Sequence, residues 1–256
     1  MRNVGWLRLP LIGTFIFLYI PIIVLVVMSF NASKLPFSWG GFSGRWYSTL
    51  LNDELIRQGF INTIIVAVGA TIFATILGTL LAIGLSRYTR SAVLEAYSLT
   101  PAIVPDLALA IGLLVMFSAV NMTLGLYSVL LAHVVFGMAF VAAIVTARLG
   151  QTDPSLEEAS RDLGSSAVGT FFRITIPSLA PAIVAGALLV FTLSLDEFVV
   201  AFFTDGPSTP TLPIVIYSMV RFGVSPEINA LAALLLLVSF TVVIAAQRFT
   251  RISDSV

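Results

Sequence analysis

Six long apolar segments follow one another along the chain, over residues 9–30, 60–85, 98–120, 123–147, 180–203 and 228–248. Each is close to the ~20 residues that a helix needs to cross the hydrocarbon core of a bilayer. Their apolar residues run continuously instead of alternating, which favours helices over the strands of a membrane barrel. The pattern predicts an all-α integral membrane protein with about six transmembrane helices in a single domain over 1–256.

Composition excludes a soluble globular domain. Hydrophobic residues make up 58% of the 256 residues and charged residues only 10%, whereas soluble domains are about 25% charged. The formal net charge is zero, so there is no electrostatic reason to expect a nucleic-acid partner. The chain has no cysteine and one histidine, His133. We therefore expect no metal site, and we interpret His133 as a buried hydrogen-bonding group.

Lysine and arginine are unevenly distributed between the segments that join the spans. If the N-terminus is cytoplasmic, the inside segments hold nine of these residues and the outside segments four. This bias predicts that both termini and the segment 150–178 are cytoplasmic and that 31–59 is outside. The outer segment contains Trp46 and Tyr47, which either line an entrance or anchor the chain at the membrane interface. The nine inside residues are Arg2, Arg8, Arg87, Arg90, Arg148, Arg161, Arg173, Arg248 and Arg251.

Small residues recur every four positions in the second span, at Ala70, Ala74, Gly78 and Ala82. Such a stripe lets the backbone of another helix approach closely. The sequence leaves two interpretations open, which are packing within this chain and contact with another subunit.

The segment 148–179 is the longest inner loop and the most polar part of the chain. Asp153 followed by Pro154 predicts the start of a helix, and Gly164 suits its end. A second short helix is expected to stop before Pro177, because proline cannot continue the hydrogen-bond ladder. The first helix would carry an apolar face, as a docking element does. This face consists of Leu156, Ala159 and Leu163.

A spaced motif lies in this loop. It reads Glu158-Ala159-Ser160, three residues, Gly164, nine residues, then Ile174-Thr175-Ile176-Pro177. It resembles the EAA loop of ABC importer permeases, with Ser160 for the second Ala and Ile176 for Leu. The resemblance implies a type I ABC importer permease fold with its core over about 60–250. It also implies that the loop couples to an ATPase subunit through Glu158, Ala159, Ser160, Gly164, Ile174 and Pro177. The alternative is an ordinary amphipathic helix at the membrane surface.

Further segments carry a narrower resemblance that covers most of the chain. They are Trp46–Ser48, Pro105-Asp106, Phe191–Val200, Gly206–Ser208, Leu212-Pro213, Ile216–Val220 and Gly223–Ala230. Together they look like the permease subunits of spermidine/putrescine importers. This implies a polyamine substrate and the inner membrane of a bacterium. The implied partners are a homologous second permease, two ATPase subunits, a periplasmic or extracellular polyamine-binding protein, and membrane lipid. ATP and Mg²⁺ would be bound by the ATPase subunits, and this chain would hold no cofactor.

Three carboxylates fall within the predicted spans, where charged groups are costly and usually functional. We place Asp106 near the inner end of the third span, and Asp196 and Glu197 in the outer half of the fifth, ~22 Å from its inner end. A polyamine in a low-dielectric barrier needs anions and aromatic faces in place of water. We therefore predict a substrate pathway that includes these acids, Ser194 and Trp46. Alternatively, the acids pair with an arginine or a backbone group at a subunit contact.

The chain lacks the short motifs of nucleotide hydrolysis and of common hydrolases. No Gly-x4-Gly-Lys-Ser/Thr, Gly-x-Ser-x-Gly or His-Glu-x-x-His sequence occurs, so we expect no enzyme activity in this chain and ATP hydrolysis by a separate polypeptide. Three alternatives to a polyamine importer are an ABC importer of another small solute, a secondary transporter driven by an ion gradient, and a scaffold that transports nothing. A secondary transporter would show inverted repeats with broken helices, and a scaffold would not need acids in its spans.

The charge bias makes a prediction about topology. A cysteine introduced at Ser166 should resist labelling by a membrane-impermeant thiol reagent in intact cells, and one at Ser48 should react. The native chain has no cysteine, so there is no background signal. Labelling at Ser166 in intact cells would contradict the predicted orientation.

Overall fold

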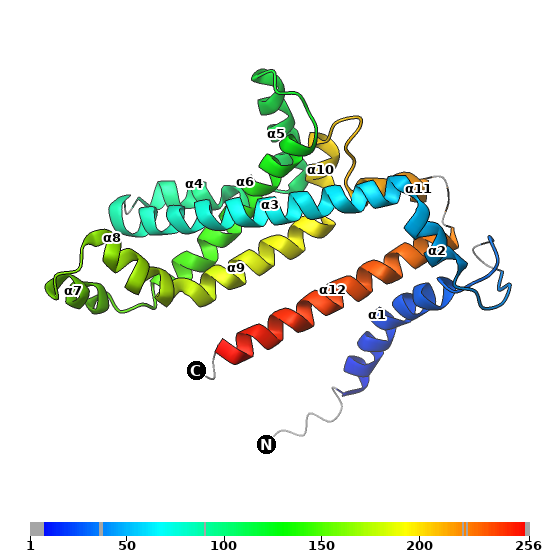
Figure 1. The fold of residues 1–256 in the computed structure, drawn as a ribbon, viewed down its shortest axis with the longest axis horizontal. Helices are drawn as coiled ribbons and strands as arrows, with labels where there is room; N and C mark the ends of the chain where they lie inside the picture. Colours follow the sequence, from blue (N-terminus) through cyan, green and yellow to red (C-terminus); the bar gives the residue numbers. More distant parts are fainter. Residues whose placement is uncertain (1–7, 36–37, 90, 222, 224, 254–256) are drawn as a thin grey trace. The chain divides into compact units, whose positions relative to one another are not determined.

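The computed structural model describes residues 8–35, 38–89, 91–221, 223 and 225–253, and only the backbone of 242–253 (Figure 1). Contacts divide the chain into two compact units, Met1–Arg57 with Val215–Val256, and Gln58–Ile214. Arg2, Arg90, Val224 and both chain ends lie outside the described residues. The single domain over 1–256 and the cytoplasmic termini therefore stay predictions.

The first unit includes three helices, α1 (Arg8–Met28), α2 (Arg45–Asn52) and α12 (Pro226–Ser253). α12 packs against both α1 and α2. α1 is apolar along its length, and none of its described residues is buried. A helix that is hydrophobic all round without being buried by protein is typical of a membrane span.

Asn31 organises the loop between α1 and α2. Its side chain donates a hydrogen bond to the carbonyl of Ser38 at 2.8 Å and accepts one from the amide of Gly40 at 2.8 Å. Trp46 donates through its indole nitrogen to the carbonyl of Asn31 at 2.7 Å, and an isolated β-bridge pairs Asn31 with Phe42. The loop is therefore folded on itself, with the ring of Trp46 as part of its interior.

The second unit is built around α6 (Leu126–Leu149). α6 packs against α4 (Ala92–Ile103), α9 (Ile176–Asp196) and α10 (Val199–Thr204), and α10 also packs against α5 (Asp106–Ala119) (Figure 1). The remaining elements include α3 (Glu54–Gly84), which begins in the first unit, η2 (Leu85–Thr89), α7 (Ser155–Asp162), α8 (Ala167–Thr170), η3 (Phe171–Thr175) and α11 (Leu212–Arg221).

The stripe of small residues on α3 lies against α6. Ala74 and Ala82 are fully buried, and a Cβ on Gly78 would lie 2.7 Å from the carbonyl oxygen of Met138. A Cβ on Gly137 of α6 would lie 3.0 Å from the side chain of Ala74. The interpretation of packing within this chain is therefore confirmed.

The helices account for the predicted spans in outline. Among the described residues, four helical runs are long and apolar enough to cross a membrane, and they match the first, second, fourth and fifth predicted spans. α12 runs over 28 residues where the sixth was predicted. These observations confirm an all-α membrane fold, and the number of helices that could cross a membrane is roughly consistent with the predicted six. The four runs are Arg8–Met28, Glu54–Thr89, Leu126–Leu149 and Ala167–Asp196.

The third span predicted over 98–120 is not one continuous helix. α4 and α5 are two helices bent by 105° relative to each other. The break lies at Val104 and Pro105, because Pro105 has no amide hydrogen to continue the ladder. Asp106 is the first residue of α5.

The fifth span predicted over 180–203 is wrong in its extent. The helical run starts earlier, at Ala167, and ends at Asp196. Glu197 and Phe198 separate it from α10. A second break therefore follows Asp196 and includes Glu197, where the sequence predicted a continuous helix.

Close packing of α3 on α6 predicts the effect of a single added methyl group. Gly78→Ala would place a Cβ 2.7 Å from a backbone oxygen, so it should lower stability by about 1–3 kcal/mol. Gly112→Ala on α5 is a matched control, since no atom lies within 4 Å of its Cβ position. The thermal midpoint of the purified protein in detergent measures both effects. Equal midpoints for the two variants would contradict the packing.

Candidate functional site

α7 starts and ends close to where its sequence predicts, at Ser155 and Asp162, with Pro154 directly before it. The Asp153 carboxylate accepts a hydrogen bond from the amide of Ser155 at 2.9 Å, and bonding to Ser155 lowers the pKa of Asp153 below its ordinary value. Gly164 has a φ of +87°. The amides of Gly164 and Ser165 donate to the carbonyls of Arg161 and Ser160. This pattern is a Schellman C-cap, in which a left-handed residue ends the helix.

The apolar face of α7 lies on the surface of the chain. Leu163 is 89% exposed and Leu156 54% exposed. Ala159 and Glu158, two of the predicted coupling residues, are also exposed. An apolar stripe that its own chain does not cover is typical of a surface that another protein binds.

Glu157 joins α7 to two other helical runs. Its carboxylate accepts hydrogen bonds from both terminal nitrogens of Arg87, with Nη1 at 2.6 Å, and from Thr175 Oγ1 at 2.6 Å. Burial raises the pKa of Glu157, but the bonds from Arg87 and Thr175 and the charges of Arg87 and Arg161 outweigh it, so the pKa is lowered. The carboxylate is therefore ionised at neutral pH. Its contribution to stability is lost only as the pH falls through the lowered pKa.

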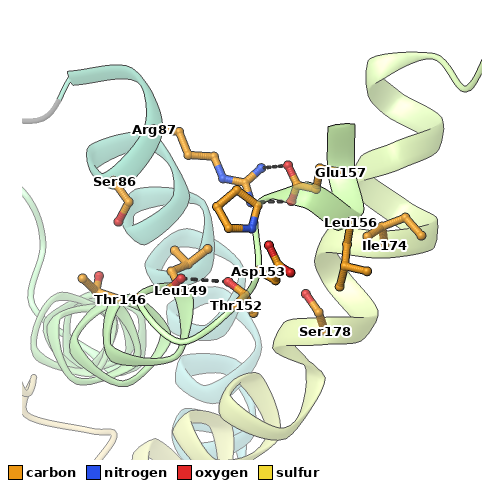
Figure 2. A pocket seen from close by; sticks show the side chains of 12 residues that line it. Ser86, Arg87, Thr146, Leu149, Thr152, Asp153, Leu156, Glu157, Ile174 and Ser178 are labelled. Atoms are coloured by element: carbon orange, nitrogen blue, oxygen red, sulfur yellow. Dashed lines mark hydrogen bonds and ion pairs between the residues drawn. The ribbon is translucent and has the colours of Figure 1, made fainter. Parts of the chain in front are cut away.

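Figure 2 shows the side chains of Arg87 and Glu157 facing each other beside a cavity of about 420 Å³. The predicted coupling residue Ile174 also lines this cavity. α7 therefore lies over an open space instead of a packed core. The other lining residues are Ser86, Thr146, Leu149, Gly150, Thr152, Asp153, Pro154, Leu156 and Ser178.

The second short helix after α7 does not stop before Pro177, contrary to the prediction. Ser166 caps α8, and the helix continues through the π-helical segment η3 into α9, where Pro177 is near the first residue. Proline cannot donate to the carbonyl four residues earlier, and the wider π turn before it accommodates that missing bond. Ser160 of the motif lies against this helix, with its hydroxyl 3.1 Å from that of Thr170.

The two helix breaks lie near each other because α5 packs on α10. Glu197 accepts a hydrogen bond from the amide of Val200 at 2.8 Å and so caps the start of α10. Asp106 is the first residue of α5 and Glu197 lies two residues before α10, and the side chains of Asp106 and Asp196 are exposed. The packing of α5 on α10 thus brings Asp106 to the same end of this helix pair as the other two acids, and the three form one acid cluster.

The other two predicted pathway residues have partners within the protein. Ser194 is buried, and its hydroxyl lies 2.6 Å from Nδ1 of His133. This confirms His133 as a buried hydrogen-bonding group. Trp46 belongs to the first unit, where it is 7% exposed and donates to Asn31. A pathway role for Ser194 and Trp46 stays a prediction.

Residues 74–255 match the family described as binding-protein-dependent transport system inner membrane component. The chain belongs to this family. The permease is 42% identical over 237 residues to the spermidine/putrescine transport system permease protein PotC of Escherichia coli K12, covering 92% of this chain and 90% of that protein. It is also 42% identical over 250 residues to the putrescine transport system permease protein PotI of the same strain, covering 92% and 89%.

Solved ABC transporters share the fold of the permease. A bacterial ABC transporter involved in import of the acidic polysaccharide alginate aligns over 97% of this chain and 98% of that chain, with a TM-score of 0.76 at 18% identity. The MetNI methionine ABC transporter, in an inward-facing conformation, aligns over 77% and 95%, with a TM-score of 0.65 at 18% identity. The predicted ABC permease fold is therefore confirmed.

The cluster of Arg87, Glu157 and Thr175 was not predicted from the sequence. Glu157 precedes the motif residue Glu158, and adjacent helical side chains point about 100° apart. This angle indicates that the two glutamates face different surroundings. Nothing in the sequence, however, pairs Glu157 with an arginine 70 positions away.

The left-handed conformation of Gly164 predicts a rank order of activities. No atom lies within 4 Å of its Cβ position, so a substitution there reports on backbone strain and not on crowding. Alanine should cost about 1–2 kcal/mol, asparagine less and β-branched valine more. ATP-driven uptake per inserted permease should fall in the order Gly, Asn, Ala, Val. Equal uptake by Gly164→Val and the native chain would contradict a need for this turn.

Proposed function

We propose that this permease subunit is part of an ATP-driven importer of polyamines such as spermidine and putrescine. The observation that carries the proposal is the 42% identity, over 92% of the chain, to two permeases named for spermidine/putrescine and putrescine transport. The site residues of the chain have chemistry that suits such a substrate.

The acid cluster offers the interactions that a polyamine needs. The ammonium groups of a polyamine lose water on entering a low-dielectric path and must gain anions in return. Asp106 and Asp196 are exposed, so they are available to contact a substrate. Glu197 has a structural task as well, because one of its oxygens caps α10.

Transport would be coupled to ATP hydrolysis through α7. Its exposed apolar face and Glu158 would dock on one of two ATPase subunits, which would bind ATP and Mg²⁺. A homologous second permease would complete the membrane part, and a periplasmic or extracellular polyamine-binding protein would deliver the substrate from outside. In this arrangement α7 and both chain termini are cytoplasmic, and closure of the ATPase pair opens the helices outward.

An importer of another small solute is the main alternative. Related permeases share the coupling loop whatever they carry, so the loop does not decide between substrates. Among the side chains of this permease, the acid cluster favours a cationic cargo, since a neutral or anionic solute would not be helped by three carboxylates. Membership of a binding-protein-dependent family disfavours a secondary transporter and a non-transporting scaffold.

Neutralising the acids tests the substrate. Asp106→Asn, Asp196→Asn and Glu197→Gln keep shape and hydrogen bonding but remove one charge each. A carboxylate close to an ammonium group contributes about 1–3 kcal/mol at an effective dielectric near 20, which corresponds to roughly 5- to 150-fold in uptake. The measurement is uptake of radiolabelled spermidine and putrescine per assembled complex in the same membranes.

The control is Glu95→Gln, which removes an exposed acid of α4 outside the cluster. It should leave uptake unchanged. If the acids only stabilise a subunit contact, neutralising them would instead reduce the amount of assembled complex. Unchanged polyamine uptake in all three cluster variants would refute the cationic substrate, and the family assignment would be unaffected.

A further inference from the structure

Apolar packing against its own chain does not hold α7 in place. None of its eight described residues is buried, and a cavity of about 420 Å³ lies between α7, α6 and α9. A helix of this length is not stable alone in water, where about 12 residues are needed even for good helix formers. Its position must therefore come from its two flanking turns and from specific polar contacts.

Glu157 makes such contacts with two separate helical runs. Arg87 lies in η2, at the end of the run Glu54–Thr89, and Thr175 lies within the run Ala167–Asp196. The forked guanidinium of Arg87 donates through two nitrogens. Two such bonds fix the relative orientation of the two side chains as well as the distance between them. The side chain of Glu157 is only 17% exposed and that of Arg87 32%, so water screens this pair less than a surface pair.

A second glutamate–arginine pair provides a contrast. Glu54 and Arg57 lie three residues apart on α3, with side chains 68% and 56% exposed. Their bond joins two residues of a single helix turn and connects no separate elements. Pairs of this exposed kind contribute little to stability.

We propose that the Glu157 carboxylate is the point through which α7 moves the ends of α3 and α9. The proposal rests on the proposed function, in which α7 docks on an ATPase subunit. When the ATPase displaces α7, the bonds to Arg87 and Thr175 carry that displacement into both runs, and the second run ends at Asp196 in the acid cluster. Arg87, Glu157 and Thr175 are positioning residues in this proposal, because they act through the helices that their hydrogen bonds join.

The test measures how much polyamine is imported for each ATP hydrolysed by the complete reconstituted importer. Arg87→Gln and Glu157→Gln should lower this ratio by about 2- to 30-fold while the amount of assembled complex stays the same. Arg87→Lys keeps the positive charge but cannot donate two parallel hydrogen bonds. Its ratio of polyamine imported to ATP hydrolysed should therefore lie between those of the native chain and Arg87→Gln. The double exchange Arg87→Glu with Glu157→Arg should recover part of the ratio.

The matched control is Glu54→Gln, which breaks the exposed pair on α3 and should leave the ratio unchanged. A native ratio in both Arg87→Gln and Glu157→Gln would overturn the proposal, and so would a double exchange no better than either single change. If the native complex hydrolyses ATP but imports no polyamine, the proposed function fails. A second measurement then tests whether Glu157 holds α7 in position.

That measurement follows the position of α7 directly. Spin labels on cysteines at Glu95 of α4 and Asp162 of α7 report a distance within the full-length permease in lipid nanodiscs, without any need for transport or assembly. The native chain should give a narrow distance distribution, and Arg87→Gln and Glu157→Gln broad ones. Distributions as narrow as the native one in both variants would overturn the proposal.

Discussion

Two apolar helices in lipid gain no hydrophobic stabilisation by packing against each other, because lipid tails are as apolar as the helices themselves. Close contact between backbones must hold them instead, and this chain provides it where α3, α6 and α9 meet. A Cβ on Gly137 would lie 2.8 Å from the side chain of Val190 and 3.0 Å from that of Ala74. Ala74 and Val190 share one buried cluster with Val141. This contact positions α9, which carries the acids at its end and follows η3 at its start.

Lipid also makes every break in a helix costly, because the freed amides and carbonyls find no water. The permease places its two breaks near each other and provides partners at both. The amide of Val104 donates to the carbonyl of Thr100 at 2.9 Å, and Glu197 accepts from Val200. One carboxylate thus stabilises the backbone that the break exposes, while two exposed carboxylates beside it are available for a cation. In the proposed importer, the residues at the helix breaks would therefore also serve to bind the cation.

The sequence predicts those features that local chemistry determines. The Asp153-Pro154 start and the left-handed Gly164 follow from the preferences of single residues, and the long apolar runs follow from the thickness of the membrane. It does not predict the bend before Asp106 or the π turn before Pro177, because the depth at which a proline interrupts a helix depends on what packs around it. It also cannot supply the pairing of Glu157 with Arg87, since a contact between distant residues leaves no periodic pattern. The three acids were predicted as residues of the substrate pathway, but only the folded structure shows that they form one cluster.

The exposed leucines of α7 have a consequence for how the complex is maintained in the cell. In the described structure Leu163 is 89% exposed and Leu156 54% exposed, and in the proposed complex an ATPase subunit covers them. Chaperones and proteases continuously remove proteins whose apolar groups stay uncovered. Permease chains made in excess of the ATPase would therefore be degraded, and the ratio of the two subunits would be set by turnover instead of by matched synthesis.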